Sequence, residues 1–230
     1  MKTEPILAWH FVGDKLRNGA PIPADGVTLR FRGRLIMCES GFHASLRIID
    51  ALRYAPGDTV CRVLIGGETI EEPDKLVASE RSILWRLDAK ELLTEFTRKI
   101  ALSVIHLWNA PDVVKRYLET GDPKQQEAAF SAASKGYYVA GATFSYASAS
   151  AAGAAAAACA ASAAAAASAA AAACSVMPRI AAYKAVRARY AAHAATRSQE
   201  AVPGPNSVND MLTKMVEDEY EKIYSPTSLS

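Results

Sequence analysis

Cysteine is scarce in this chain, and its spacing excludes the usual disulfide scaffolds. The 230 residues contain four cysteines, and two of them, Cys159 and Cys174, lie within a run of alanines. Small secreted proteins that depend on disulfides have dense cysteines at characteristic spacings, which this chain lacks. The first residues also lack the apolar core of a signal peptide. We therefore expect a cytoplasmic protein that is kept in a reducing compartment.

The common catalytic signatures are missing as well. The chain contains no nucleophile elbow, no phosphate-binding loop and no dinucleotide-binding glycine motif. Two histidines and two cysteines near the N-terminus do not have the spacing of a zinc finger or ribbon, because neither cysteine has a paired neighbour. These four residues are His10, Cys38, His43 and Cys61. We expect no metal site and interpret both cysteines as small buried hydrophobic residues.

Acidic residues are absent between Glu127 and Glu200, although the formal net charge of the whole chain is only +2. A basic C-terminal stretch therefore adjoins a net acidic remainder. Five cations follow Pro178 in a predicted helix: Arg179, Lys184, Arg187, Arg189 and Arg197. They make nucleic-acid binding an alternative function, but at roughly 100° per residue they scatter around the helix. We prefer a solvated helix that docks on the acidic part of the chain.

Large apolar side chains are absent from the alanine-rich tract, residues 147–174. Alanine has the highest helix propensity, so a tract of this length can be helical with little packing. It is uncharged, but alanine is close to neutral for membrane insertion, and we expect no membrane span. Two interpretations stay open. The tract is either a spacer that tolerates sequence drift, or a stalk through which copies of the chain form a homo-oligomer.

The first 88 residues have the pattern of a small mixed α/β domain, which we call the head. Apolar runs and turn signals predict its strands, at residues 6–12, 27–31, 35–38 and 59–65, with one or two more between 76 and 87. The second and third of these flank a short turn and predict a hairpin. The fourth is expected to close at Gly66. Ser45 is expected to cap a short helix that ends near Tyr54.

Helical patterns begin after the head. Asp88 and Glu91 form a capping box. Two further helices are marked by a proline near the start and a glycine at the end, at Pro111 to Gly121 and at Pro123 to Gly136. A final amphipathic helix is expected after Ser207.

These patterns predict an α+β fold, a small β-rich domain followed by an all-helical, alanine-rich region. We divide the chain into four parts: the head at 1–88, a helical segment at 89–146 that packs on the head, an alanine-rich and then basic arm at 147–200, and a linker with a C-terminal helix at 201–230.

The order of features in the head resembles the layout of the ADP-ribosyltransferase superfamily. His10 lies on an early strand, Gly41-Phe42-His43 leads into a short helix that ends in Tyr54, and another strand follows. In that superfamily, an early histidine contacts the ribose on the nicotinamide side of NAD, and a later acidic residue orients the acceptor.

The resemblance implies NAD as the cofactor, with His10, Gly41 and Phe42 in its binding site. It also implies catalytic roles for His10 as the ribose contact and for Glu80 as the acid, with either His43 or Tyr54 beside the nicotinamide. His43 stands where a tyrosine is usual in that superfamily. The alternative interpretation of His10 is a histidine that serves only the core.

The chain as a whole resembles an uncharacterised family of phage and prophage proteins. The features that match include Ala8-Trp9-His10-Phe11, the segment from Cys38 to Ser45, the segment from Asp50 to Pro56, and an alanine-rich helical tract before a short C-terminal helix. This resemblance implies a phage setting, in the host cytoplasm or associated with the virion, and it implies no activity.

Three hypotheses about function follow, and whether the chain is an enzyme stays open. The first is a phage accessory protein that acts through binding or self-association, with a host or phage protein as partner. The second is an NAD-dependent transferase that resembles the ADP-ribosyltransferases. The third is nucleic-acid binding by the basic helix.

Overall fold

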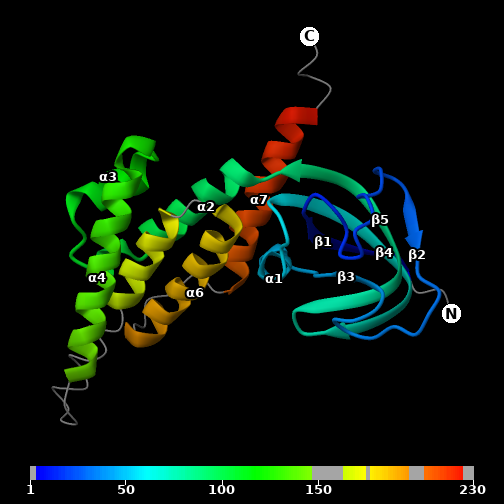
Figure 1. The fold of residues 1–230 in the computed structure, drawn as a ribbon, viewed down its shortest axis with the longest axis horizontal. Coiled ribbons are helices and arrows are strands. Elements are labelled where there is room, and N and C mark those ends of the chain that lie inside the picture. Colours follow the sequence, from blue (N-terminus) through cyan, green and yellow to red (C-terminus); the bar gives the residue numbers. More distant parts are fainter. Residues whose placement is uncertain (1–3, 147–162, 175–176, 197–204, 225–230) are drawn as a thin grey trace. The chain divides into compact units, whose positions relative to one another are not determined.

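The chain divides into two units, and the first is not continuous in sequence. Unit 1 contains Met1–Lys90 together with Pro205–Ser230, and unit 2 contains Glu91–Gly204. The computed structural model describes residues 4–146, 163–174, 177–196 and 205–224 (Figure 1). A five-stranded antiparallel sheet in the N-terminal part is followed by helices, so the predicted α+β class is confirmed.

Unit 1 is built on one sheet with the strand order β1-β4-β5-β2, and β3 pairs with β5 outside this order. The strands are β1 (Ile6–Val12), β2 (Thr28–Arg30), β3 (Phe42–Ala44), β4 (Thr59–Glu72) and β5 (Lys75–Asp88). Alternate residues of a strand point to opposite faces of its sheet. Cys61, Val63 and Ile65 accordingly face a buried core that β1 and β5 complete with Ala8 and Ile83.

A bulge shapes the central β4–β5 hairpin. The register between the two strands shifts between Gly66 and Thr69. Gly67 has a φ of 74°, and a Cβ atom there would lie 2.1 Å from the hydroxyl of Ser79. That hydroxyl instead accepts a hydrogen bond from the Glu68 N–H at 2.9 Å. A bulge bends its strand, and Figure 1 shows both strands curving along their length. The prediction that this strand closes at Gly66 is therefore wrong, because the glycines bend it without ending it.

The hairpin predicted at residues 27–31 and 35–38 is also wrong. β2 pairs with β5 instead, and residues 35–38 contribute one isolated bridge and a turn. Side chains favour the observed pairing. The Thr28 hydroxyl lies 2.7 Å from that of Ser82, and Arg30 forms an ion pair with Glu80 at 3.2 Å.

Ser45 does not cap the short helix, which is α1 (Ile48–Arg53). Arg47 is the N-cap residue, and its side chain makes no capping hydrogen bond. The backbone of Ser45 is already used, because its N–H and C=O groups pair with those of Trp9 at 2.9 and 2.8 Å. This bridge ties the segment before α1 to β1.

The C-terminal helix α7 (Pro205–Tyr224) belongs to unit 1 and packs against α1 (Figure 1). Val208, Leu212 and Val216 lie four residues apart and form its buried stripe. Near its C-terminal end, the ring of Tyr220 stacks on Trp85 of β5, with centroids 4.2 Å apart. The sequence predicts this helix, but it gives no sign that the helix packs beside the N-terminal domain.

Unit 2 is helical in its described residues. Its elements are α2 (Lys90–Leu102), which begins at the unit boundary, a 3-10 turn (Ile105–Leu107), α3 (Asp112–Thr120), a second 3-10 turn (Pro123–Gln125), α4 (Gln126–Tyr146) and α6 (Pro178–Thr196). The Asp88 half of the predicted capping box is present, because Asp88 accepts a hydrogen bond from the Lys90 N–H at 3.0 Å. Gly121 ends α3 in the left-handed conformation, also as predicted.

Gly136 does not end a helix, which corrects a second boundary. α4 continues through it, and a Cβ atom at this position would lie 2.2 Å from the ring of Trp108. The glycine is therefore explained by the close approach of an indole ring and not by a helix terminus.

The described part of the alanine-rich tract packs inside unit 2. Residues 163–173 are helical, and Ala166, Ala169, Ala170 and Ala173 join the buried core of the unit. Their small side chains let neighbouring helices approach closely. Residues 147–162 lie outside the described residues. Among the helices that the structure describes, none combines the length and the apolar composition that a membrane span requires.

Replacing Leu212 by alanine tests the packing of α7. Leu212 is fully buried, so Leu212→Ala should lower the free energy of unfolding by about 2 to 4 kcal/mol through lost apolar contact and the cavity left behind. Met211→Ala is the matched control, because 37% of Met211 is exposed, and its cost should stay below about 1 kcal/mol. Urea denaturation of the full chain measures both. Equal costs for the two variants would contradict the packing described for α7.

Candidate functional site

A cavity of about 910 Å³ lies in unit 1. Its lining comes from β1, the loop after β1, the residue after β2, the turn before β3, β3 itself, the end of α1, and the start and middle of β5. Five residues that the sequence singles out line this cavity together: His10, Gly41, Phe42, His43 and Tyr54. Glu80 is not among the described residues that line it. The structure therefore brings together five of the six candidates for the NAD site.

His10 lies on β1 opposite Cys61 of β4. Burial lowers the pKa of His10 well below its usual value of 6.5, and the nearby Arg81 and His43 lower it further. The residue as a whole is only partly buried, and it lines the cavity. His10 is therefore a neutral imidazole at pH 7, able to donate one hydrogen bond and accept another.

His43 holds the turn that precedes β3. Its Nε2 atom accepts a hydrogen bond from the Cys38 N–H at 2.8 Å, and its ring also forms a hydrogen bond with the Gly41 backbone. Burial lowers the pKa of His43, although the bond to Gly41 acts in the opposite direction. Because Nε2 must stay unprotonated to accept from Cys38, the neutral ring is the form that stabilises the turn. In this conformation His43 positions other residues, and its ring is not free to act as a base.

Cys38 has an unusual backbone conformation within this turn. Its φ is 65°, in the left-handed region that disfavours residues with a side chain. Both of its backbone groups have partners, since Arg17 donates to the Cys38 carbonyl at 2.9 Å and His43 accepts from its N–H. The thiol is free and exposed, and it contacts the ammonium group of Lys75. Cys38 is thus not the small buried hydrophobic residue that the sequence predicts, whereas Cys61 is buried as predicted.

Glycine is the residue that fits at position 41, because a side chain there would be strained and would clash. Its φ is 105°, and a Cβ atom there would lie 2.6 Å from Val77 Cγ2 and 2.7 Å from Leu35 Cδ2. The glycine allows the turn to lie directly on β5, and this close approach aligns Phe42 opposite Ala78 in the β3–β5 ladder.

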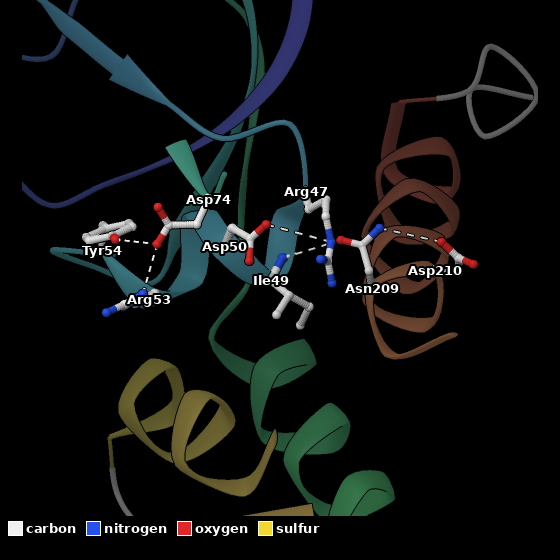
Figure 2. A network of polar contacts seen from close by, with 8 residues as sticks. All are labelled: Arg47, Ile49, Asp50, Arg53, Tyr54, Asp74, Asn209 and Asp210. Carbon is white, nitrogen blue, oxygen red and sulfur yellow. Dashed lines mark hydrogen bonds and ion pairs between the residues drawn. The ribbon is translucent and has the colours of Figure 1, made fainter. Parts of the chain in front are cut away.

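Tyr54 stands at the rim of the cavity in a polar network that Figure 2 shows. Its hydroxyl donates to Asp74 Oδ2 at 2.6 Å, and Arg53 donates to the same oxygen at 2.8 Å. The hydrogen bond from Tyr54 lowers the pKa of the Asp74 carboxyl. Asp74 lies in the turn of the β4–β5 hairpin, so this network fastens the tip of the hairpin to the end of α1.

The other end of α1 is held by α7, in the same network (Figure 2). The N-terminal N–H groups of a helix lack partners within the helix. Asn209 Oδ1 of α7 accepts from the Ile49 N–H at 3.5 Å, and Arg47 pairs with Asp50 at 3.7 Å. The helix that presents Tyr54 to the cavity is therefore contacted at both ends by distant parts of the chain.

Arg81, which the sequence patterns did not single out, is the charged group of the cavity interior. Glu80 forms its ion pair with Arg30, and the next residue, Arg81, lines the cavity with only 5% of its surface exposed. Neighbouring residues of a strand point to opposite faces, and Arg81 shares the face of Ile83, a core residue. Strand parity alone could not have identified it, because Leu76 and Ala78 of the same strand also belong to the core and share the parity of Glu80.

Two other groups of residues remain to be placed, the potential metal ligands and the basic residues that follow Pro178. No group of three or more metal-ligating side chains occurs among the residues that the structure describes. Of the basic set, Arg189 is buried, Lys184 and Arg187 are exposed, Arg179 is half-buried, and Arg197 lies outside the described residues. α6 therefore presents fewer cations to solvent than its sequence suggests.

Comparison with known proteins locates a domain without assigning an activity. Residues 6–95 match the model of a family described as a domain of unknown function, DUF7666. The matched range contains all five strands, α1 and every described residue that lines the cavity, while α7 lies outside it. No curated protein and no solved structure matches the chain. The match carries no link to phage proteins or to ADP-ribosyltransferases.

The turn before β3 can be tested at Gly41. Gly41→Ala combines backbone strain with a clash against Val77 and Leu35, and it should cost about 2 to 5 kcal/mol of unfolding free energy. Gly19→Ala is the matched control, since Gly19 has a φ of 82° but no atom within 4 Å of the position that a Cβ atom would take. It should cost only about 1 kcal/mol. Thermal and urea unfolding measure both, and similar costs would contradict the close approach described for Gly41.

The lowered pKa values of His10 and His43 predict a pH dependence of stability. Each histidine binds its proton more weakly in the folded chain than in the unfolded chain, where the pKa is about 6.5. Their contribution is therefore complete above pH 6.5 and is lost as the pH falls below it, by up to about 1.4 kcal/mol per pH unit for each proton excluded. Urea denaturation between about pH 5.5 and 7.5 should show this slope, and His10→Gln should reduce it. Stability that is flat or rises toward pH 5.5 would contradict the prediction.

Proposed function

We propose that the chain acts by binding a small molecule in the cavity of unit 1, and that this ligand is a nucleotide of the NAD type. The observation that carries the proposal is the convergence of His10, Gly41, Phe42, His43 and Tyr54 on one cavity. These residues come from three separate segments, and the resemblance to the ADP-ribosyltransferases implies a role for each of them. A common cavity supports a common role, and its volume lies in the range of ligand sites.

The chemistry of the walls suits a ligand with planar rings and hydroxyl groups. The aromatic side chains of Phe31, Phe42 and Tyr54 all line the cavity, and aromatic rings stack on the faces of bases. The neutral ring of His10 offers a donor and an acceptor to a ribose hydroxyl.

Binding is better supported than transfer of ADP-ribose. The resemblance to ADP-ribosyltransferases assigns the acid to Glu80, which forms an ion pair with Arg30 and is not part of the described lining. Among the described lining residues the one carboxylate is Glu39, which is exposed in the turn before β3. Transferase activity is therefore an alternative that requires a carboxylate from another source.

The biological setting that we propose is that of a phage or prophage accessory protein, in the host cytoplasm or with the virion. The resemblance of the whole chain to phage proteins supports it. Self-association through the alanine-rich tract is supported less, because residues 163–174 pack within their own unit. Nucleic-acid binding by α6 is also supported less, because Arg189 is buried.

Calorimetric titration of the full-length chain with NAD tests the proposal. The full chain is needed because α7 belongs to unit 1. We expect saturable binding with a dissociation constant between about 1 μM and 1 mM. His10→Ala should weaken it about tenfold or more, since a hydrogen bond to the ligand is lost.

Glu80→Gln is the matched control, and it should leave the affinity for NAD unchanged because this side chain forms its ion pair outside the lining. Circular dichroism checks that each variant is folded. The absence of saturable heat from the folded wild-type chain would rule out the NAD site, and equal loss in the two variants would contradict the placement of the ligand.

A further inference from the structure

Arg81 is a buried cation that opens onto the cavity. Its side chain lies on β5 among core residues, with 5% of the residue exposed. One guanidinium N–H donates to the His43 carbonyl at 2.9 Å, and the group lies 5.3 Å from the centre of the Phe42 ring. A guanidinium has five N–H donors, so these contacts use a small part of its capacity. The remaining donors belong to a side chain that lines the cavity.

No anionic group of the described chain neutralises this cation. Among the described residues, no Asp or Glu forms an ion pair with Arg81. Burial lowers the pKa of Arg81 to about 10, which leaves it protonated at pH 7. The nearby Cys61 thiol cannot balance the charge, because burial raises its pKa to about 11. Burying a charge without a counter-charge is costly, so Arg81 is unfavourable in the unliganded chain.

The surroundings add to the positive charge. Lys15, Arg17 and Lys75 line the same cavity, and Glu39 is the one carboxylate among the described lining residues. Arg17 is held by its hydrogen bond to the Cys38 carbonyl, and Lys75 pairs at 3.3 Å with Glu72. A concave surface lined mainly by one sign of charge attracts ligands of the opposite sign.

We propose that Arg81 is the anchor of a subsite for an anionic group, a carboxylate or a phosphate, carried by the small molecule that occupies this cavity. The planar guanidinium binds such groups through two parallel hydrogen bonds. The inference rests on the same cavity as the proposed function, but it does not require that the anionic ligand be NAD. An incoming anion supplies the counter-charge that the chain itself does not provide, and Lys75 and Arg17 guide it toward the interior.

Binding of defined probes by the full-length chain tests the subsite. ADP-ribose, pyrophosphate and succinate supply phosphate and carboxylate groups, while adenosine and nicotinamide lack an anion. We expect saturable calorimetric binding of at least one anionic probe, and a higher melting temperature in its presence. Arg81→Gln should weaken that binding about 10- to 100-fold, the range of a lost charged hydrogen bond. Arg81→Lys keeps the charge but loses the paired donors of the planar guanidinium. Its affinity for the anionic probe should lie between those of the wild type and Arg81→Gln.

Arg30→Gln is the matched control, since Arg30 is an exposed arginine that pairs with Glu80 on β5, and it should bind the anionic probes as the wild type does. A second readout separates a binding role from a structural one. Arg81→Met should match or exceed the wild-type melting temperature without ligand, because it removes an unpaired buried charge. A clearly lower melting temperature for Arg81→Met, with anion binding unchanged in Arg81→Lys and Arg81→Gln, would overturn the proposal.

The outcomes separate this inference from the proposed function. If an anionic probe binds through Arg81 but NAD does not bind, the subsite stands and the NAD proposal fails. If NAD binds equally to the wild type and Arg81→Gln, the NAD proposal stands and the subsite is excluded. If no anionic probe binds to the folded wild-type chain, the subsite is excluded as well.

Discussion

The bent β4–β5 hairpin is the constraint on which the rest of unit 1 depends. Every other strand pairs with one of its two members, and β3 pairs with β5 at Leu76–Ala78, beyond the bulge near Gly67. The curved hairpin pairs with β1 along the first half of β4, and it pairs with β3 through the part of β5 near the hairpin tip. The turn that bears Gly41 and His43 can then line the same cavity as His10 of β1. A straight hairpin of this length would hold these side chains farther apart.

Sequence patterns were reliable where the signal is strong and local. Apolar runs identified β1 and the start of β4, and the capping residue Asp88 and the terminal Gly121 marked real helix ends. They failed where a distant partner decides the conformation. Residues 35–38 form a turn because His43 and Arg17 hold the backbone of Cys38, and the place of α7 depends on an aromatic stack with Trp85. Arg17 lies 21 residues from Cys38, and Trp85 lies far from α7 in the sequence, so no local pattern marks these two partners.

The candidate site was predictable to a similar extent. The resemblance to the ADP-ribosyltransferase layout implies roles for His10, His43 and Tyr54, and these residues line one cavity. The same reasoning selected Glu80 and missed Arg81, because order along the chain carries no information on which face a strand residue occupies. Parity within β5 would not have corrected the choice, because Ile83 has the parity of Arg81 while the core residues Leu76 and Ala78 have that of Glu80. The support of Tyr54 by Asp74 and the positioning of α1 by Asn209 required the structure itself.

Three features that disfavour the folded state lie at this one cavity. The guanidinium of Arg81 is buried without a counter-charge, Cys38 holds a left-handed backbone, and the core borders a cavity of about 910 Å³. Elsewhere in unit 1 side chains pack against one another in the ordinary way, as where the ring of Tyr220 stacks on Trp85. A chain under pressure for stability alone would fill the cavity and replace the arginine with an apolar residue, as core packing favours. Local violations of folding rules that gather at one place are typical of a functional site. Their coincidence favours a ligand site over a packing defect, because a defect gives no reason for charge, strain and empty volume to occur together.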